Sequence, residues 1–218
     1  MNKTIVVKGI GKASTRPDTV MISMYLETTD FDYQKAMEKA SDSIDKITKC
    51  LGKVGIDKKD LKTTAFNVQT LYNSHRRKDG SYYEEFKGYE VNHNLQLLFD
   101  FDTKLLSLVL GAIGGCEVHP RFNIQFTVRD SATINEEMLR SATANARRKA
   151  EILCEASGKK LGELISIDYD WGEFDIYSNT RYIMEDRCML GNAEMSAMEI
   201  EPEDIETSDT VTFVWEID

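Results

Sequence analysis

The sequence predicts an α+β protein in which a mainly antiparallel sheet has its helices packed on one face. The first observation is a strand-helix-strand unit that occurs twice, at residues 17–72 and 119–171, and we predict that these duplicated units form the sheet. In each copy a long helix ends near a glycine, Gly55 in the first and Gly158 in the second. The second observation is the period-two alternation of apolar residues in the strand segments, and the third is the short turns between neighbouring strands, which favour antiparallel pairing. These features are typical of the α+β class.

Two strands open the chain. Residues 3–11 form the first, and a second strand begins after Pro17. Gly9 and Gly11 lack the third glycine and the following helix of a dinucleotide-binding loop, so we interpret them as a turn or bulge that requires glycine. The second strand has apolar side chains on one face, as expected for a half-buried strand. These residues are Val20, Ile22, Met24 and Leu26.

A long helix follows in the first copy. Asp30 or Asp32 is placed to cap its first turn, and Gly55 is placed to end it in a left-handed turn. The apolar positions between them have helical spacing and form one stripe: Ala36, Met37, Ala40, Ile44, Ile47, Leu51 and Val54. We therefore expect an amphipathic helix packed against the sheet.

Residues 61–101 have the pattern of a long hairpin. Asp79 and Gly80 are a strong turn signal at a polar tip, and Gly88 marks a bulge or bend in the second strand. Apolar and polar side chains alternate along that strand, and its apolar face includes His93, which we interpret as a hydrogen-bonded core or interface histidine. The length of the hairpin predicts that its tip extends beyond the body of the protein.

A short helix capped by Asp102 comes next and ends at Gly114, after which the second copy begins. The helix of this copy, at about residues 131–157, has three alanines on one face, at positions 142, 146 and 150. Small side chains allow another backbone to approach closely, and two partners fit the pattern. The alanine face packs either on the protein's own sheet or on a helix of a neighbouring subunit.

Residues 175–205 interrupt the strands and helices of what we predict to be a single domain, residues 1–218. The chain has a net charge of −10, and the segment from Asp175 to Asp209 contributes −8 of it through ten acidic residues and two arginines. Residues 175–205 also contain four of the nine methionines, and the flexible side chain of methionine suits adaptable contact surfaces. Three interpretations stay open: docking on a subunit or partner, disorder, and a soft-metal site formed by Met184, Cys188 and Met189.

No constellation of residues in the sequence indicates a reaction or a cofactor. His75, His93 and His119 lack the spacing of a metal-ligand cluster, and the four cysteines form neither a CxxC pair nor a zinc motif. We expect Cys50 and Cys154, near the ends of the two long helices, to be buried free thiols. We therefore predict no catalytic residue, no cofactor and no metal, and an enzyme is the less favoured class.

Charge and the N-terminal sequence bear on partners and location. The excess of acidic residues disfavours nucleic-acid binding, which depends on clustered lysine and arginine. No stretch approaches the ~20 apolar residues of a membrane span, so we expect none. Because the N-terminus lacks the apolar core of a signal peptide, we expect a cytoplasmic protein as the sequence stands, or a periplasmic or exported protein if a signal has been removed.

The order and spacing of several short motifs resemble those of the SIMPL-domain family, which includes bacterial periplasmic immunogenic proteins and an oxidative-stress-defence protein. The motifs are Val7, Gly9 and Gly11; Pro17-Asp18; Ala36 and Ala40; Val54-Gly55-Ile56; Lys62-Thr63; Gly88-Tyr89 with Asn94; Gly158; and Leu161-Gly162. The resemblance covers nearly the whole chain and implies an α+β protein that assembles into large ring-like or barrel-like oligomers, without established catalytic residues. The chain departs from the family pattern in two features. It lacks the signal peptide of many bacterial members, and it lacks a proline that is often found near the position of Tyr72.

We therefore predict a non-enzymatic, self-assembling protein that acts through oligomerisation and partner binding, with a role in stress defence implied by the resemblance. The candidate contact residues lie at the hairpin tip and in the methionine-rich segment: Arg76, Arg77, Tyr82, Tyr83, Met184, Met189, Met195 and Met198. We expect a homo-oligomer that can also bind a protein partner. The alternative is a small-molecule-binding protein, or an enzyme, with a cleft between the two repeated halves.

Overall fold

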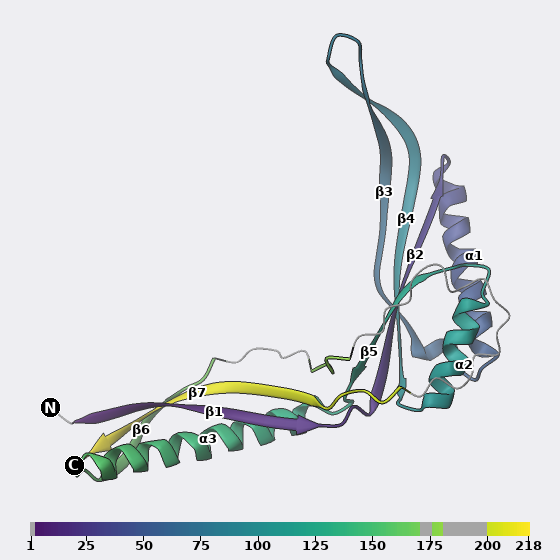
Figure 1. Cartoon of the computed structure of the whole chain (residues 1–218). Helices are drawn as coiled ribbons and strands as arrows, with labels where there is room; N and C mark the ends of the chain where they lie inside the picture. Colours follow the sequence, from purple (N-terminus) through teal and green to yellow (C-terminus); the bar gives the residue numbers. More distant parts are fainter. Residues whose placement is uncertain (1–2, 171–175, 181–199) are drawn as a thin grey trace. The chain divides into compact units, whose positions relative to one another are not determined.

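The computed structural model describes residues 3–170, 176–180 and 200–218, which form three α-helices and seven strands (Figure 1). These residues divide into two compact units, each with its own antiparallel sheet. The first unit contains residues 3–18, 127–170, 176–180 and 202–218, and the second contains residues 19–126 and 200–201. The α+β class and the mainly antiparallel pairing are confirmed.

The first unit is a three-stranded sheet with one long helix on it. Its strands are β1 (Thr4–Thr15), β6 (Leu161–Asp168) and β7 (Ile205–Ile217), in the order β1-β7-β6. The strand that ends the chain is therefore central, and it pairs with β1 along the full length of β1. Helix α3 (Ser131–Ala156) lies along β1 and β7 (Figure 1).

The alanine face of α3 packs on the protein's own sheet. Ala142, Ala146 and Ala150 are fully buried in one core with Phe213 and Trp215 of β7. Of the two predicted partners for this face, the structure therefore provides the sheet.

Gly9 and Gly11 explain why α3 comes so close to the sheet. A Cβ atom on Gly9 would lie 2.1 Å from the carbonyl oxygen of Ala142, and one on Gly11 would lie 2.0 Å from that of Met138. The predicted turn or bulge at these glycines is wrong, because β1 pairs with β7 in unbroken register through both. Glycine is needed there because the helix backbone leaves no room for a side chain.

The second unit is a four-stranded sheet in the order β3-β4-β2-β5. Its elements in chain order are β2 (Thr19–Asp30), α1 (Tyr33–Gly52), a 3-10 turn (Lys58–Asp60), β3 (Leu61–Arg76), β4 (Tyr82–Asp100), α2 (Thr103–Gly114) and β5 (Arg121–Thr127). The apolar face of β2, predicted from its alternation, is buried against α1, α2 and the matching residues of β4. The stripe predicted for α1 is buried: Ile47 and Leu51 pack in this core, and Ala36 and Ala40 form a smaller cluster with Val91 of β4.

The predicted starts of α1 and α2 agree with the structure, whereas α1 ends at Gly52, before the predicted end at Gly55. Asp32 is the N-cap of α1 and accepts a hydrogen bond from the Lys35 backbone N–H at 3.0 Å. Asp30, the other candidate, instead accepts from Asp32 N–H and pairs with Lys39 at 2.7 Å. Asp102 caps α2 in the same way as Asp32 caps α1, which accounts for the start of both helices.

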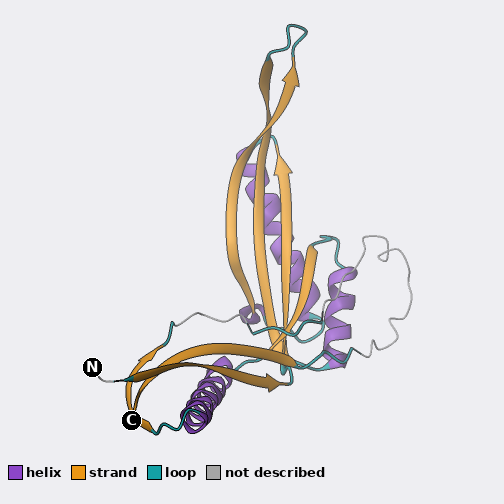
Figure 2. Cartoon of the chain, turned by 60° about the vertical axis from the view of Figure 1, so that its left-hand side comes forward, coloured by secondary structure: helices purple, strands orange, loops and turns teal. Residues whose placement is uncertain are grey.

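The predicted hairpin of β3 and β4 extends past its neighbours. Strand β2 pairs with β4 only as far as Tyr89, which lies opposite Asp30. Beyond that point β3 and β4 are, among the described residues, paired only with each other, and they continue as a two-stranded ribbon (Figures 1 and 2). We call this ribbon, residues 71–88, the arm. A bulge marks its base, where Gly88 has φ 136° and lies against the Asp30 backbone.

The predicted internal repeat is not confirmed. In the first copy, β2 and β3 belong to the same sheet, with β4 between them. In the second copy, β5 belongs to the four-stranded sheet, whereas β6 belongs to the three-stranded one.

Among the described residues, no helix combines the length and the hydrophobicity that a bilayer crossing requires.

Candidate interaction surface and polar pocket

The structure brings the four described candidate residues together at the tip of the arm. Arg76 lies opposite Tyr82 in the ladder, and the Arg77 guanidinium carbon is 5.1 Å from the centre of the Tyr83 ring. The Tyr83 ring also stacks on His75 at 5.3 Å. The remaining predicted contact residues, Met184, Met189, Met195 and Met198, lie outside the residues that the structure describes, as does Cys188.

The turn at the tip follows from local hydrogen bonding. Gly80 has φ 88°, a left-handed conformation that glycine adopts without strain. The Asp79 carboxylate accepts hydrogen bonds from the Ser81 N–H at 2.9 Å and from its hydroxyl at 2.7 Å, and these bonds hold the pKa of Asp79 below its usual value. The carboxylate therefore stays charged beside three cations, Arg76, Arg77 and Lys78.

An aromatic cluster lies at the base of the arm, and no motif in the sequence indicates it. It consists of Phe31, Tyr33, Tyr72, Phe86 and Tyr89, whose neighbouring rings meet edge to face with centroids 5.2–5.7 Å apart. Such contacts stabilise a cluster beyond the burial of its area. Although they pack together, Phe31 is 68% exposed and Tyr33 and Tyr72 are each 52% exposed. The cluster thus presents a large apolar surface to solvent.

Strand β3 is an edge strand along its whole length. Within the part of the chain that the structure describes it pairs only with β4, and none of its 16 residues is buried. Phe66 and Tyr72 are the large apolar side chains that it exposes. One side of this strand therefore carries backbone groups without partners in the sheet, and such an edge is a template for pairing with another strand.

A polar pocket lies on the face of the four-stranded sheet opposite its helices. Its volume is about 590 Å³, and its polar lining residues are Ser23, Tyr25, Thr64, Asn94, Arg121 and Asn123. Ser23, Tyr25 and Thr64 belong to the first predicted copy, and Arg121 and Asn123 belong to the second. The pocket is thus lined by strands of both.

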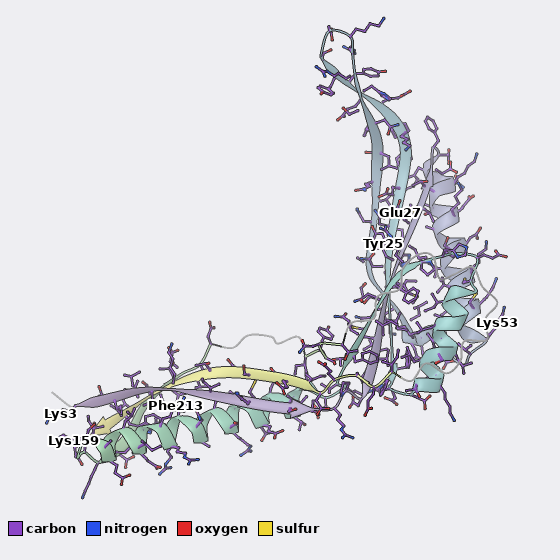
Figure 3. The ribbon with its side chains drawn as sticks, in the orientation of Figure 1. Lys3, Tyr25, Glu27, Lys53, Lys159 and Phe213 are labelled. Atoms are coloured by element: carbon purple, nitrogen blue, oxygen red, sulfur yellow. The ribbon has the colours of Figure 1, made fainter. Side chains whose placement is uncertain are left out.

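Arg121 is held in place at the edge of this pocket. Its guanidinium nitrogen is 3.0 Å from the Glu27 carboxylate, and its guanidinium carbon is 4.8 Å from the centre of the Tyr25 ring. Both partners project from β2 (Figure 3). The Tyr25 hydroxyl in turn donates to Asn92 at 2.8 Å. Because Glu27 already neutralises the cation, this arrangement suits a neutral polar molecule better than an anion.

His93 is a buried histidine of the core, as predicted. It is 7% exposed, its Nε2 atom is 2.7 Å from the Thr63 hydroxyl, and its ring meets that of Phe66 edge to face. Burial lowers the pKa of His93 below its usual value, because a charged ring loses hydration there. Both ring nitrogens of a protonated histidine carry a hydrogen, and Nδ1 has no hydrogen-bond partner among the described residues. His93 therefore serves the core in its neutral form.

Comparison with known proteins assigns the family. The sequence profile of the SIMPL family, described as a protein of unknown function (DUF541), matches residues 5–215. The chain belongs to the SIMPL family. The profile spans both structural units, so the resemblance inferred from the motifs is confirmed.

Curated relatives of this SIMPL protein come from several bacteria. The 26 kDa periplasmic immunogenic protein of Brucella melitensis biotype 1 is 29% identical over 171 residues, which cover 75% of this chain and 65% of that protein. The protein of the same name from Brucella abortus (strain S19) matches with the same identity and coverage. The uncharacterized protein YggE of Edwardsiella ictaluri is 24% identical over 213 residues, 98% of this chain and 86% of that protein. The matched region thus spans about two thirds of the length of the Brucella relatives.

Proposed function

We propose that this SIMPL protein is a non-enzymatic, self-assembling protein whose arm and β3 edge bind a second copy of the chain. The observation that carries the proposal is an edge strand of 16 residues without one buried residue, beside an exposed aromatic cluster. A strand of this length is normally covered or shortened in a monomer, because its free edge promotes association.

Two contributions to binding come from the same surface. The edge of β3 supplies backbone hydrogen bonds to an added strand, and this is a common mode of recognition. The aromatic cluster supplies apolar area, with Phe31, Tyr33 and Tyr72 each more than half exposed. Large aromatic side chains at the centre of an interface account for much of its binding energy. An edge beside an aromatic patch therefore favours a specific contact.

The charge of the chain favours a second copy as the partner. The tip of the arm carries three successive cations, Arg76, Arg77 and Lys78, whereas the whole chain has a net charge of −10. A basic tip on an acidic protein is attracted to the acidic surface of another copy, and this attraction increases the rate of association. Salt screens exposed charges over about 10 Å at 0.1 M, so assembly should slow as salt rises.

The location and biological role that we propose for the protein are inferred from its bacterial relatives. Because Brucella relatives carry the name periplasmic immunogenic protein, we infer that the mature protein works outside the cytoplasm. Stress defence and the binding of a further protein partner rest on family analogy alone. Cell fractionation followed by immunoblotting tests the location, and recovery of the protein only with cytoplasmic markers contradicts it.

Light scattering coupled to size exclusion tests the assembly. We expect the mass of the wild-type protein in solution to be a defined multiple of 24.8 kDa, the mass of one chain. The double variant Phe31→Ser with Tyr72→Ser removes two exposed aromatic side chains without opening the core, and we expect it to dissociate. Loss of one hot-spot aromatic costs about 2 kcal/mol or more, which weakens binding about 30-fold.

Leu108→Ser is the matched control for this experiment. Leu108 is exposed to a similar degree, but it lies on α2, away from the arm. Circular dichroism should show that all three proteins are folded. A monomeric wild type, or a double variant with the mass of the wild type, would contradict the proposal.

A second candidate function is the binding of a small polar molecule in the pocket beside Arg121. The support is the pocket of about 590 Å³, whose polar side chains converge on one face of the sheet. A thermal-shift screen against neutral polar metabolites tests it, because a ligand that binds the native state raises the unfolding temperature. The shift must be smaller in Asn94→Leu, and an equal shift in that variant would place the ligand elsewhere.

A further inference from the structure

Two cysteines lie together at one end of the second unit. Cys50 is in the last turn of α1, and Cys116 comes two residues after the end of α2. Both are free thiols and pack in the same hydrophobic core. Cys116 is only 1% exposed, whereas Cys50 is partly accessible to solvent. A reagent in solution therefore meets Cys50 first.

An ion pair holds the same two segments together. Lys46 lies one helical turn before Cys50, on the same face of α1. Its amino group is 3.0 Å from the carboxylate of Glu117, the residue that follows Cys116. The Cys116 thiol is close enough to the Cys50 thiol to raise the pKa of Cys50. The end of α1 and the segment after α2 thus meet at this ion pair, and both cysteines pack in the core beside it.

We infer that Cys50 and Cys116 are a redox-active pair that forms an intrachain disulfide on reaction with a low-molecular-weight disulfide such as glutathione disulfide. The Cys50 thiolate attacks one sulfur of the oxidant, which forms a mixed disulfide and releases one glutathione thiolate. The Cys116 thiolate then attacks Cys50 Sγ and displaces the second glutathione thiolate. The protein loses two protons and two electrons, and glutathione disulfide is reduced to two glutathione molecules.

The surroundings of Cys50 determine how fast this reaction is. The hydrogen bond with Cys116 and burial both raise the pKa of the Cys50 thiol above its usual value. Because the thiolate is the nucleophile, the pair reacts slowly at neutral pH and faster as the pH rises. The pair is therefore a slow, stabilising cross-link and not a rapid peroxide sensor.

The position of the bond indicates its effect. The segment between the two cysteines contains the whole of β3 and β4, including the arm. A disulfide there closes this segment into a loop and restricts the unfolded chain. Oxidation should therefore stabilise the sheet that bears the arm. Cys154 lies in the first unit, next to the Ala150 turn of α3, and is not part of this pair.

Peptide mapping of the full-length protein tests the inference. The wild type is incubated with glutathione disulfide at pH 8, alkylated and digested without reduction. We expect a linked peptide that contains Cys50 and Cys116, and a loss of two hydrogen masses from the intact protein. Hydrogen–deuterium exchange of α1 and α2 should be slower in the oxidised protein.

Variants show that the bond depends on this pair. Cys50→Ala should not form the linked peptide, and its exchange should be unchanged by the oxidant, whereas Cys154→Ala should behave like the wild type. The mapping of the wild type is decisive even if one variant fails to fold. If Cys50 and Cys116 are both still free after a long incubation, the inference is overturned. A bond from Cys50 to Cys154 or Cys188, or a link between two chains on a non-reducing gel, would also overturn it.

Discussion

Replacing Gly9 with alanine tests how closely α3 packs on β1. The added Cβ would lie 2.1 Å from the carbonyl oxygen of Ala142, about 1.3 Å short of the 3.4 Å at which ordinary contact begins. It would also lie 2.7 Å from the Cβ of Ala146. Neither atom can rotate away, so the helix has to move off the strand.

The cost follows from this displacement. Extra atoms in a well-packed core cost about 1–3 kcal/mol, and a helix lifted off its sheet also loses dispersion contacts. Alanine recovers about 0.5–1 kcal/mol because it is less flexible than glycine in the unfolded chain. We therefore expect Gly9→Ala to destabilise the first unit by about 2 kcal/mol.

Urea unfolding followed by the fluorescence of Trp215 measures this loss, because Trp215 lies in the core that α3 covers. The Trp171→Phe background isolates its signal. Gly111→Ala in α2 is the control, since a Cβ there would meet nothing within 4 Å, and we expect it to stabilise its helix by about 0.5–1 kcal/mol. A Gly9→Ala midpoint equal to that of the wild type would refute the argument from close packing.

Two further predictions concern the second unit. Burial lowers the pKa of His93, so as the pH falls the unfolded chain binds a proton at His93 before the folded protein does. The contribution of neutral His93 to the free energy of unfolding is therefore complete above 6.5, the pKa of His93 in the unfolded chain, and is lost as the pH falls through its pKa in the folded protein. Urea midpoints measured between pH 8 and 5 should fall less steeply in His93→Gln than in the wild type, and parallel curves would count against the assignment. Asp32→Ala should destabilise the protein by about 1 kcal/mol and Asp32→Asn by less, because an N-cap oxygen accepts a backbone hydrogen bond. Thermal denaturation followed by circular dichroism measures the stability of both Asp32 variants. If the two variants lose the same stability, the hydrogen bond is not what stabilises α1.

Elements that depend on near neighbours in the chain were predictable. The starts of α1 and α2 at Asp32 and Asp102, and the left-handed Gly55 after α1, follow from hydrogen bonds and backbone preferences within one turn. The buried face of β2 follows from alternation, and so does the burial of His93. Each of these features requires only the identity of residues a few positions apart.

Features that depend on distant segments were not predictable. The sequence predicts a turn or bulge at Gly9 and Gly11, because no local pattern shows that α3, more than 120 residues later, covers them. The aromatic cluster unites Phe31 and Tyr33 with residues of a hairpin that begins after α1. Large aromatic side chains are mostly buried in folded proteins, and only the positions of the neighbouring elements leave Phe31, Tyr33 and Tyr72 exposed.

The sequence by itself determined the class of fold, the helices and their caps, and the long hairpin, because periodicity and local hydrogen bonding act over short stretches of chain. The tertiary structure decided which strands share a sheet, and it separated β5 from β6 although the sequence places them in one repeated unit. It also decided that β3 is at the edge of the sheet that the described residues form, and that Cys50 and Cys116 pack in the same core. Strand order and side-chain contacts depend on the burial that the whole chain achieves, and no local pattern encodes that total.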